Sequence, residues 1–135
     1  MEITSKRVIL DTDILIDFLR GRESAIKFIK SFVESGIDVG TTVINIFELS
    51  WGAYKIRRLR DVEELSAAIV VLALTFKEAI KAGEEMAYLA SLGLIIDVRD
   101  LLIGIIAREN NYAVATGNIK DFNRIRGLEV IVYKR

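Results

Sequence analysis

The chain of 135 residues contains no histidine, cysteine, proline or glutamine, and only two methionines. Without cysteine it can form no disulfide and has no thiolate nucleophile. The joint absence of histidine and cysteine excludes zinc and copper sites of the usual kind, together with Ser–His and Cys–His catalytic dyads. Any acid–base or metal chemistry must therefore depend on carboxylates.

Long hydrophobic runs and an excess of charge of one sign are also missing. The longest apolar runs, such as residues 70–74, are far too short to span a bilayer, and the polar start of the chain does not resemble a signal peptide. We therefore expect a cytoplasmic protein with no membrane partner. The 19 basic and 19 acidic side chains cancel, so a nucleic acid would have to be held by a local basic patch.

The composition, 52% hydrophobic and 28% charged, is typical of one folded domain over residues 1–135. We expect strands at 7–11, 37–42, 69–75, 112–116 and 128–133, and helices at 13–21, 23–36, 41–60, 62–68, 76–93 and 98–110. The threonine at 41 is the expected N-cap of its helix. Alternating strands and helices predict an α/β fold with a parallel sheet covered on both faces. In such sheets ligands bind beyond the carboxyl ends of the strands.

Two acidic residues, Asp11 and Asp13, directly follow the first apolar strand. This position would place them in the binding crevice of a parallel sheet. An aspartate after a strand is equally typical of a helix N-cap. The pair alone therefore does not distinguish a binding site from a cap.

Glu48 is expected on a helix that is apolar on nearly all sides. Only one stripe of this helix is small or polar, and its members are three or four residues apart: Thr41, Asn45, Glu48 and Gly52. A carboxylate among so many apolar side chains needs a partner. We favour a functional role over an ion pair with a neighbouring helix, because the other members of the stripe are small or neutral.

Asp97 and Asp100 begin a similar stripe on the helix expected at 98–110, which continues with Gly104 and Ala107. A glycine inside a helix costs stability, so Gly104 indicates that something approaches this face closely. Alternatively, Asp97 caps the helix and Asp100 only favours its positive end, an interpretation that suits Asp97 better.

The last polar group, Asn118 and Asp121, follows the strand expected at 112–116, although Gly-Asn is also common in simple turns. Acidic side chains that converge raise one another's pKa and repel. A hard divalent cation, Mg²⁺ or Mn²⁺, would supply the counter-charge and keep water for chemistry. We expect Asp17 and Glu34 to lie outside this cluster, so neutral substitution of either should have little effect on activity.

Four stretches resemble, in order and spacing, the PIN domain family and within it the VapC-type toxins of toxin–antitoxin pairs. They are LDTDILIDFLRG at 10–21, TTVINIFELSWG at 41–52, RDLLIGIIA at 99–107 and TGNIKDF at 116–122. The resemblance implies a PIN-like, Rossmann-like three-layer α/β/α fold around a parallel sheet of four or five strands. It also implies a Mg²⁺- or Mn²⁺-dependent ribonuclease, a cognate antitoxin and a homodimer.

By this resemblance, Asp11, Glu48 and Asp100 match the core acids of the family. The fourth ligand position falls to Asp121, to Asn118 or to both. Further polar residues are expected around these ligands: Asp97, Thr116 and Asp13.

A basic run continues the helix of Glu48 and is a candidate for contact with RNA or with an antitoxin: Lys55, Arg57, Arg58 and Arg60. The alternative is a solvated helix end. Surplus aromatic residues are expected to form a surface for self-association or for binding a partner peptide: Phe18, Phe28, Phe32, Trp51 and Tyr54.

Two other functions remain open. The Asp-Thr-Asp sequence after a strand also begins haloacid-dehalogenase-like phosphohydrolases, although Leu15 stands where that motif usually has Thr or Val. A catalytically silent PIN-like scaffold is the other alternative, and the neutral Asn118 is its best support.

Overall fold

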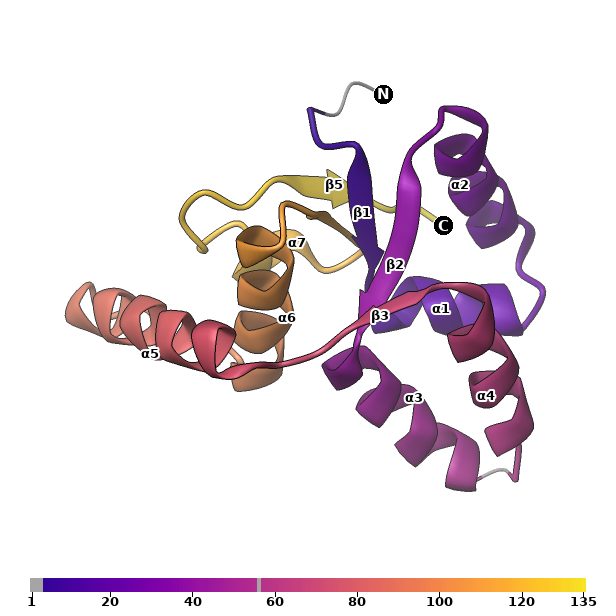
Figure 1. Ribbon diagram of the computed structural model, residues 1–135, viewed down its shortest axis with the longest axis horizontal. Coiled ribbons are helices and arrows are strands. Elements are labelled where there is room, and N and C mark those ends of the chain that lie inside the picture. Colours follow the sequence, from indigo (N-terminus) through magenta and orange to yellow (C-terminus); the bar gives the residue numbers. More distant parts are fainter. Residues whose placement is uncertain (1–3, 56) are drawn as a thin grey trace.

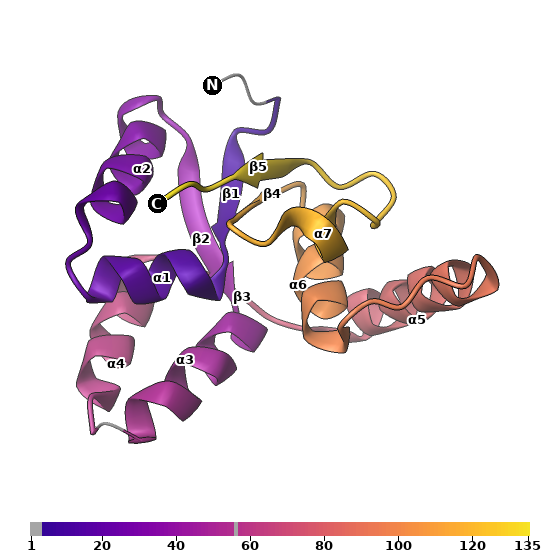
Figure 2. The same cartoon turned by 180° about the vertical axis from the view of Figure 1, so that it is seen from behind.

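The computed structural model describes residues 4–55 and 57–135, and its centre is a five-stranded parallel sheet (Figures 1 and 2). The strands are β1 (Arg7–Leu10), β2 (Asp38–Thr42), β3 (Val70–Leu72), β4 (Ala113–Thr116) and β5 (Val130–Val132). Their spatial order is β3-β2-β1-β4-β5, and every pairing is parallel. The predicted α/β fold is therefore confirmed, with the sheet at the upper of the two expected strand counts.

The helices are α1 (Thr12–Leu19), α2 (Glu23–Glu34), α3 (Val43–Lys55), α4 (Leu59–Ala68), α5 (Phe76–Ser91), α6 (Val98–Glu109) and α7 (Ile119–Phe122). Three details differ from prediction. The Glu48 helix, expected at 41–60, ends at Lys55 and α4 begins at Leu59, so the basic run does not continue one helix. Thr41 belongs to β2, and the hydroxyl of Thr42 instead accepts the backbone N–H of Asn45 at 3.3 Å in the first turn of α3. The short helix α7 lies where we expected a turn. The expected helix at 41–60 includes position 56, which lies outside the described residues.

Successive side chains of a strand point to opposite faces of the sheet, and helices cover both faces, so both faces are buried. On β1, Val8 and Leu10 pack into a core shared with α1, α2, α3 and α4. Ile9 points the other way, into a second core formed with α5, α6 and α7. This arrangement produces the three layers and explains why the strands are continuously apolar.

Gly104 allows α6 to pack closely against the segment around α7. A Cβ at this position would collide with the side chain of Ile125 and would come within 3.5 Å of Phe122. The close approach predicted from this glycine is therefore made by the protein's own core.

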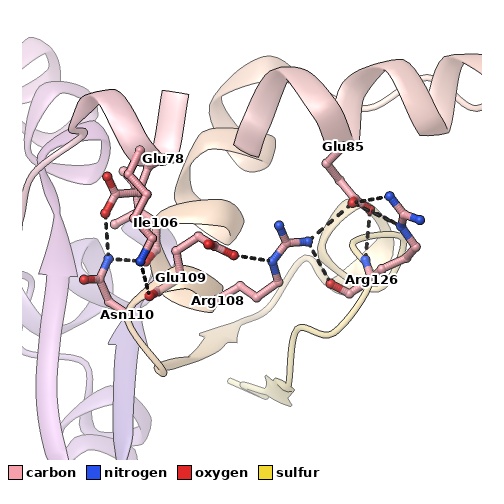
Figure 3. A network of polar contacts seen from close by, with 8 residues as sticks. Glu78, Glu85, Ile106, Arg108, Glu109, Asn110 and Arg126 are labelled. Atoms are coloured by element: carbon pink, nitrogen blue, oxygen red, sulfur yellow. Dashed lines mark hydrogen bonds and ion pairs between the residues drawn. The ribbon is translucent and has the colours of Figure 1, made fainter. Parts of the chain in front are cut away.

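Helix α5 projects away from the sheet and packs along α6 (Figures 1 and 2). A buried ion-pair network fastens it there (Figure 3). Glu85, only 1% exposed, accepts hydrogen bonds from Arg126 at 3.0 Å and from Arg108 at 3.3 Å. Near the start of α5, Glu78 accepts a hydrogen bond from Asn110 at 3.1 Å. The sequence did not identify this network.

Asp17 lies outside the predicted cluster, as expected, but it is fully buried rather than free to change. Its carboxylate accepts hydrogen bonds from Tyr133 at 2.8 Å and from Arg135 at 2.9 and 3.0 Å. These partners hold the Asp17 pKa below its usual value despite its burial. Asp17 therefore supports the fold, and its expected small effect on activity stays a prediction.

The aromatic residues divide between the core and the surface. Phe32 is buried, so the expectation that it lies at the surface was wrong, and Phe18 and Phe28 are half-buried and pack against the core. Trp51 and Tyr54 are exposed, at 56% and 67%. Of the helices in the described ranges, none combines the length and apolarity required to cross a membrane.

Candidate active site

An open cleft of about 330 Å³ lies at the carboxyl ends of β1 and β4. The chain leaves β1 toward β2 and β3 on one side, whereas β4 and β5 add on the other, so this end of the sheet contains its topological switch point. Its lining residues come from the first turns of α1 and α6, from α3 and from the segment that contains α7. The lining residues are Asp11, Thr12, Asp13, Glu48, Asp97, Arg99, Asp100, Asn118 and Asp121.

Asp11 is both a helix cap and part of the cleft. One oxygen accepts the backbone N–H of Thr12 at 2.8 Å and the amide of Asn45 at 3.1 Å, and the other accepts the hydroxyl of Thr116 at 2.7 Å. Burial raises the Asp11 pKa to about 6, because the charged form loses water. The hydrogen bond from Thr116 opposes this shift, and the negative charge of Asp13 adds to it.

Asp13 connects α1 to the loop that follows β4. Its carboxylate accepts the backbone N–H groups of Ile14 at 2.9 Å and of Gly117 at 2.8 Å. Burial raises the pKa of Asp13. Both oxygens are therefore engaged in positioning backbone, which agrees with the expected supporting role.

Glu48 reaches the cleft from α3 and is held from two sides. Its Oε1 accepts the hydroxyl of Thr12 at 2.8 Å, and its Oε2 lies 3.5 Å from the guanidinium of Arg99 on α6. Glu48 therefore lines the cleft and also forms an ion pair with a neighbouring helix, the alternative that the sequence analysis did not favour. Gly52, from the same predicted stripe, instead lines a neighbouring apolar pocket.

Asn45 orients Asp11 directly and Glu48 through Thr12, a role that the sequence analysis did not assign to it. Its side chain is fully buried, and its amide donates to Asp11 at 3.1 Å and to Thr12 at 2.9 Å. The hydroxyl of Thr42 donates to the Asn45 carbonyl oxygen at 2.7 Å, which fixes the orientation of the amide. Its place on the polar stripe of α3 was the signal that could have revealed it.

Asp100 faces the same cleft from the first turn of α6. Burial is the main cause that raises its pKa to about 7, and the nearby carboxylates of Asp11 and Asp121 add to the shift. Asp97 caps α6 by accepting the backbone N–H groups of Arg99 at 2.8 Å and Asp100 at 3.4 Å. The capping interpretation thus holds for Asp97.

Asn118 and Asp121 both line the cleft from the segment that contains α7. The backbone N–H of Asn118 donates to the hydroxyl of Thr116 at 3.0 Å, and Asp121 accepts the backbone N–H of Asp97 at 3.3 Å. The structure therefore brings every predicted acid, together with Asn118 and Thr116, to one place.

Comparisons with known proteins agree with this architecture. The PIN domain family model matches residues 8–128. The chain belongs to the PIN domain family. This PIN domain is 27% identical to Ribonuclease VapC1 of Rickettsia felis over 127 residues, which are 92% of this chain and 94% of that protein. The resemblance seen in the four sequence stretches is confirmed.

Solved structures of toxin–antitoxin complexes have the same fold as this PIN domain. VapBC2 of Rickettsia felis, bound to a promoter DNA fragment, contains a chain that superimposes with a TM-score of 0.85 at 23% identity, covering 95% of this chain and 99% of that one. A chain of DNA-bound VapBC of Salmonella typhimurium superimposes with a TM-score of 0.83 at 26% identity, covering 95% of this chain and 98% of that one. The family match favours the PIN interpretation over a haloacid-dehalogenase-like enzyme.

The predicted basic patch lies apart from the cleft of this PIN domain. Lys55 is seven residues beyond Glu48 on α3, about 10 Å along the helix axis. Arg58 pairs with Asp61 at 2.6 Å, and Arg60 with Glu64 at 3.6 Å. In the part of the chain that the structure describes, the four basic side chains of this run do not line the cleft. Arg99 is instead the only cationic side chain among its described lining residues.

The donor chemistry of the cleft suits Mg²⁺ or Mn²⁺, since carboxylate oxygens are the ligands that these hard cations prefer. Burial raises the pKa values of Asp11 and Asp100, and neighbouring carboxylates add to both shifts, so a bound cation would favour the charged forms. Within residues 4–55 and 57–135, however, no three acidic side chains close around a single point. The residues fit the metal in type and charge, but they do not form a fully assembled site.

Proposed function

We propose that this PIN domain is a Mg²⁺- or Mn²⁺-dependent ribonuclease and the toxin of a type II toxin–antitoxin pair. The observation that carries the proposal is the convergence of acids from separate elements at the switch point of the sheet: Asp11, Glu48, Asp100 and Asp121. Family membership and the similarity to a VapC ribonuclease support the same chemistry.

The residues of the cleft have distinct roles in this proposal. Asp11, Glu48 and Asp100, with Asp121 or Asn118, would hold the metal. When bound, a divalent cation lowers the pKa of a coordinated water and neutralises charge on the phosphate. Asn45 and Thr116 keep the Asp11 oxygens in place through their hydrogen bonds. We expect hydrolysis of the phosphodiester to leave a 5′-phosphate and a 3′-hydroxyl.

A cognate antitoxin is the expected protein partner, because the VapBC relatives are complexes of this kind. Exposed aromatic side chains on α3, namely Phe47, Trp51 and Tyr54, offer apolar contact area. The basic run at residues 55–60 remains a candidate for contact with RNA or antitoxin. A homodimer also remains part of the proposal.

Cleavage of RNA by the purified, antitoxin-free protein tests the proposal. Cleavage is expected with Mg²⁺ or Mn²⁺ and should stop in excess EDTA. Asp11→Asn, Glu48→Gln and Asp100→Asn should each abolish it, and Asp121→Asn should have an intermediate effect because Asn118 shares its place. Glu34→Gln, which changes an exposed carboxylate on α2, is the control. Cleavage that persists in chelator, or equal losses in Glu34→Gln, would contradict the assignment.

A catalytically silent RNA-binding scaffold is the second candidate. It is favoured by the neutral Asn118 and by the incompletely assembled acids. Metal-independent RNA binding without any cleavage product would support it over the nuclease.

A further inference from the structure

Arg99 is placed where it does not help its own helix. It is the second residue of α6, close to the positive end of the helix dipole, where a cation is unfavourable. Its guanidinium nevertheless spans the cleft: Nη1 lies 3.5 Å from Glu48 on α3, and Nη2 lies 3.3 Å from Asp97. The position of this arginine is therefore explained by the carboxylates around it.

The three core acids differ in their access to this cation. Glu48 has one oxygen occupied by Thr12 and the other facing Arg99. Asp11 and Asp100 form no ion pair within the described part of the chain. Glu48 is thus the one of these three acids with an ion-pair partner in the described part of the chain.

We propose that Arg99 is an internal counter-ion that competes with a divalent cation for Glu48. A cation that binds all three core acids must take the Glu48 oxygen that Arg99 now faces. Arg99 would keep its contacts with Asp97 and remain at the rim of the cleft. This competition also explains why the acids share a cleft without closing around one point.

The inference rests on the proposed function only in that the cleft binds a divalent cation. It predicts that removal of the Arg99 charge tightens metal binding. The Arg99 side chain is 45% exposed, so solvent weakens its ion pair. For a pair of this strength we expect the dissociation constant for the metal to fall about 1.5- to fivefold.

The test is direct titration of EDTA-treated, metal-free protein with MnCl₂, followed by electron paramagnetic resonance, and with MgCl₂ by calorimetry. No RNA is present, so the result does not depend on activity. Arg99→Met keeps an apolar side chain of similar length and should bind more tightly than wild type. Lys120→Met is the matched control, since it removes a positive charge from exposed α7 without touching Glu48.

A second comparison isolates the contact itself. In a Glu48→Gln background, Arg99→Met should give no gain in affinity, because the carboxylate for which Arg99 competes is gone. Three results would overturn the inference while leaving the nuclease proposal intact. Wild type and Arg99→Met could bind the metal equally well, Arg99→Met and Lys120→Met could gain equal affinity, or the gain could persist with Glu48→Gln. Absence of metal binding in both wild type and Arg99→Met would overturn the inference and the metal requirement together.

Discussion

At the scale of single residues, Asp11 and Asp100 show that the cleft lowers the stability of the folded protein when its acids ionise. Each is partly removed from water and lies among other carboxylates, so each holds its proton to a higher pH than an ordinary aspartate. Ionising them in the folded protein is therefore unfavourable, as expected for an active site that requires its counter-charge from outside.

Asp100→Asn should make the metal-free protein more stable at neutral pH. The folded-state pKa of Asp100, about 7, lies above the ordinary value of 3.8, so its cost to stability appears as the pH rises through this interval. The free energy of unfolding of the variant should equal that of wild type at pH 4 and exceed it by its full amount above pH 7. Because Asp100 is only partly buried, we expect this amount to be about 0.5–2 kcal/mol. Thermal unfolding in EDTA from pH 4 to 8 measures it. A difference that grows toward low pH would contradict the shift.

Asp17→Asn should destabilise the protein, although the sequence predicts little effect on activity. The substitution weakens charge-assisted hydrogen bonds from Arg135 and Tyr133 to a fully buried group, at a cost of about 1–3 kcal/mol. Urea unfolding measures this cost, with Glu34→Gln as the exposed control. Unchanged stability in Asp17→Asn would show that the buried network contributes little.

Residue types and positions predicted the acids of the cleft but not the groups that hold them. Asp11, Glu48 and Asp100 stand out because a carboxylate is costly beside so many apolar residues. Asn45 and Arg99 could not be assigned in the same way, since their roles depend on which side chains face them across the cleft. Such contacts join residues far apart in sequence.

At the scale of helices and strands, periodicity predicted most elements and failed at their ends. The expected strand at 69–75 shortens to β3 because only Val70–Leu72 pairs with β2. The helix α7 has four residues, too few for a periodic pattern to appear. The orientation of α5 was also beyond prediction, because it depends on Glu85 meeting Arg126 from a distant loop.

Glu85→Gln should loosen α5 more than the rest of the molecule. It removes the charge that binds Arg108 and Arg126, a loss of about 1–3 kcal/mol. Hydrogen exchange should accelerate in α5 while the central strands stay protected. The neighbouring Glu84→Gln, at an exposed position, is the control. Equal exchange in the two variants would mean that the network does not fasten the helix.

For the molecule as a whole, the alternation of strands and helices predicted the parallel sheet, and the family resemblance predicted its three layers. Neither gave the strand order, which is set by long-range pairing of β1 with both β2 and β4. That pairing creates the switch point and brings acids together from segments up to 110 positions apart, Asp11 and Asp121. The site is thus a property of the topology.

The most direct test of the metal-binding cleft is thermal unfolding of wild type and Asp100→Asn, each with and without Mg²⁺. A ligand that binds only the folded state stabilises it by about 2.7 kcal/mol at 100 times its dissociation constant. We predict that Mg²⁺ raises the Tm of wild type in a concentration-dependent way, that Asp100→Asn is more stable than wild type without metal, and that it responds less to Mg²⁺. A variant that is less stable without metal and responds to Mg²⁺ as wild type does would show that Asp100 belongs to no metal site.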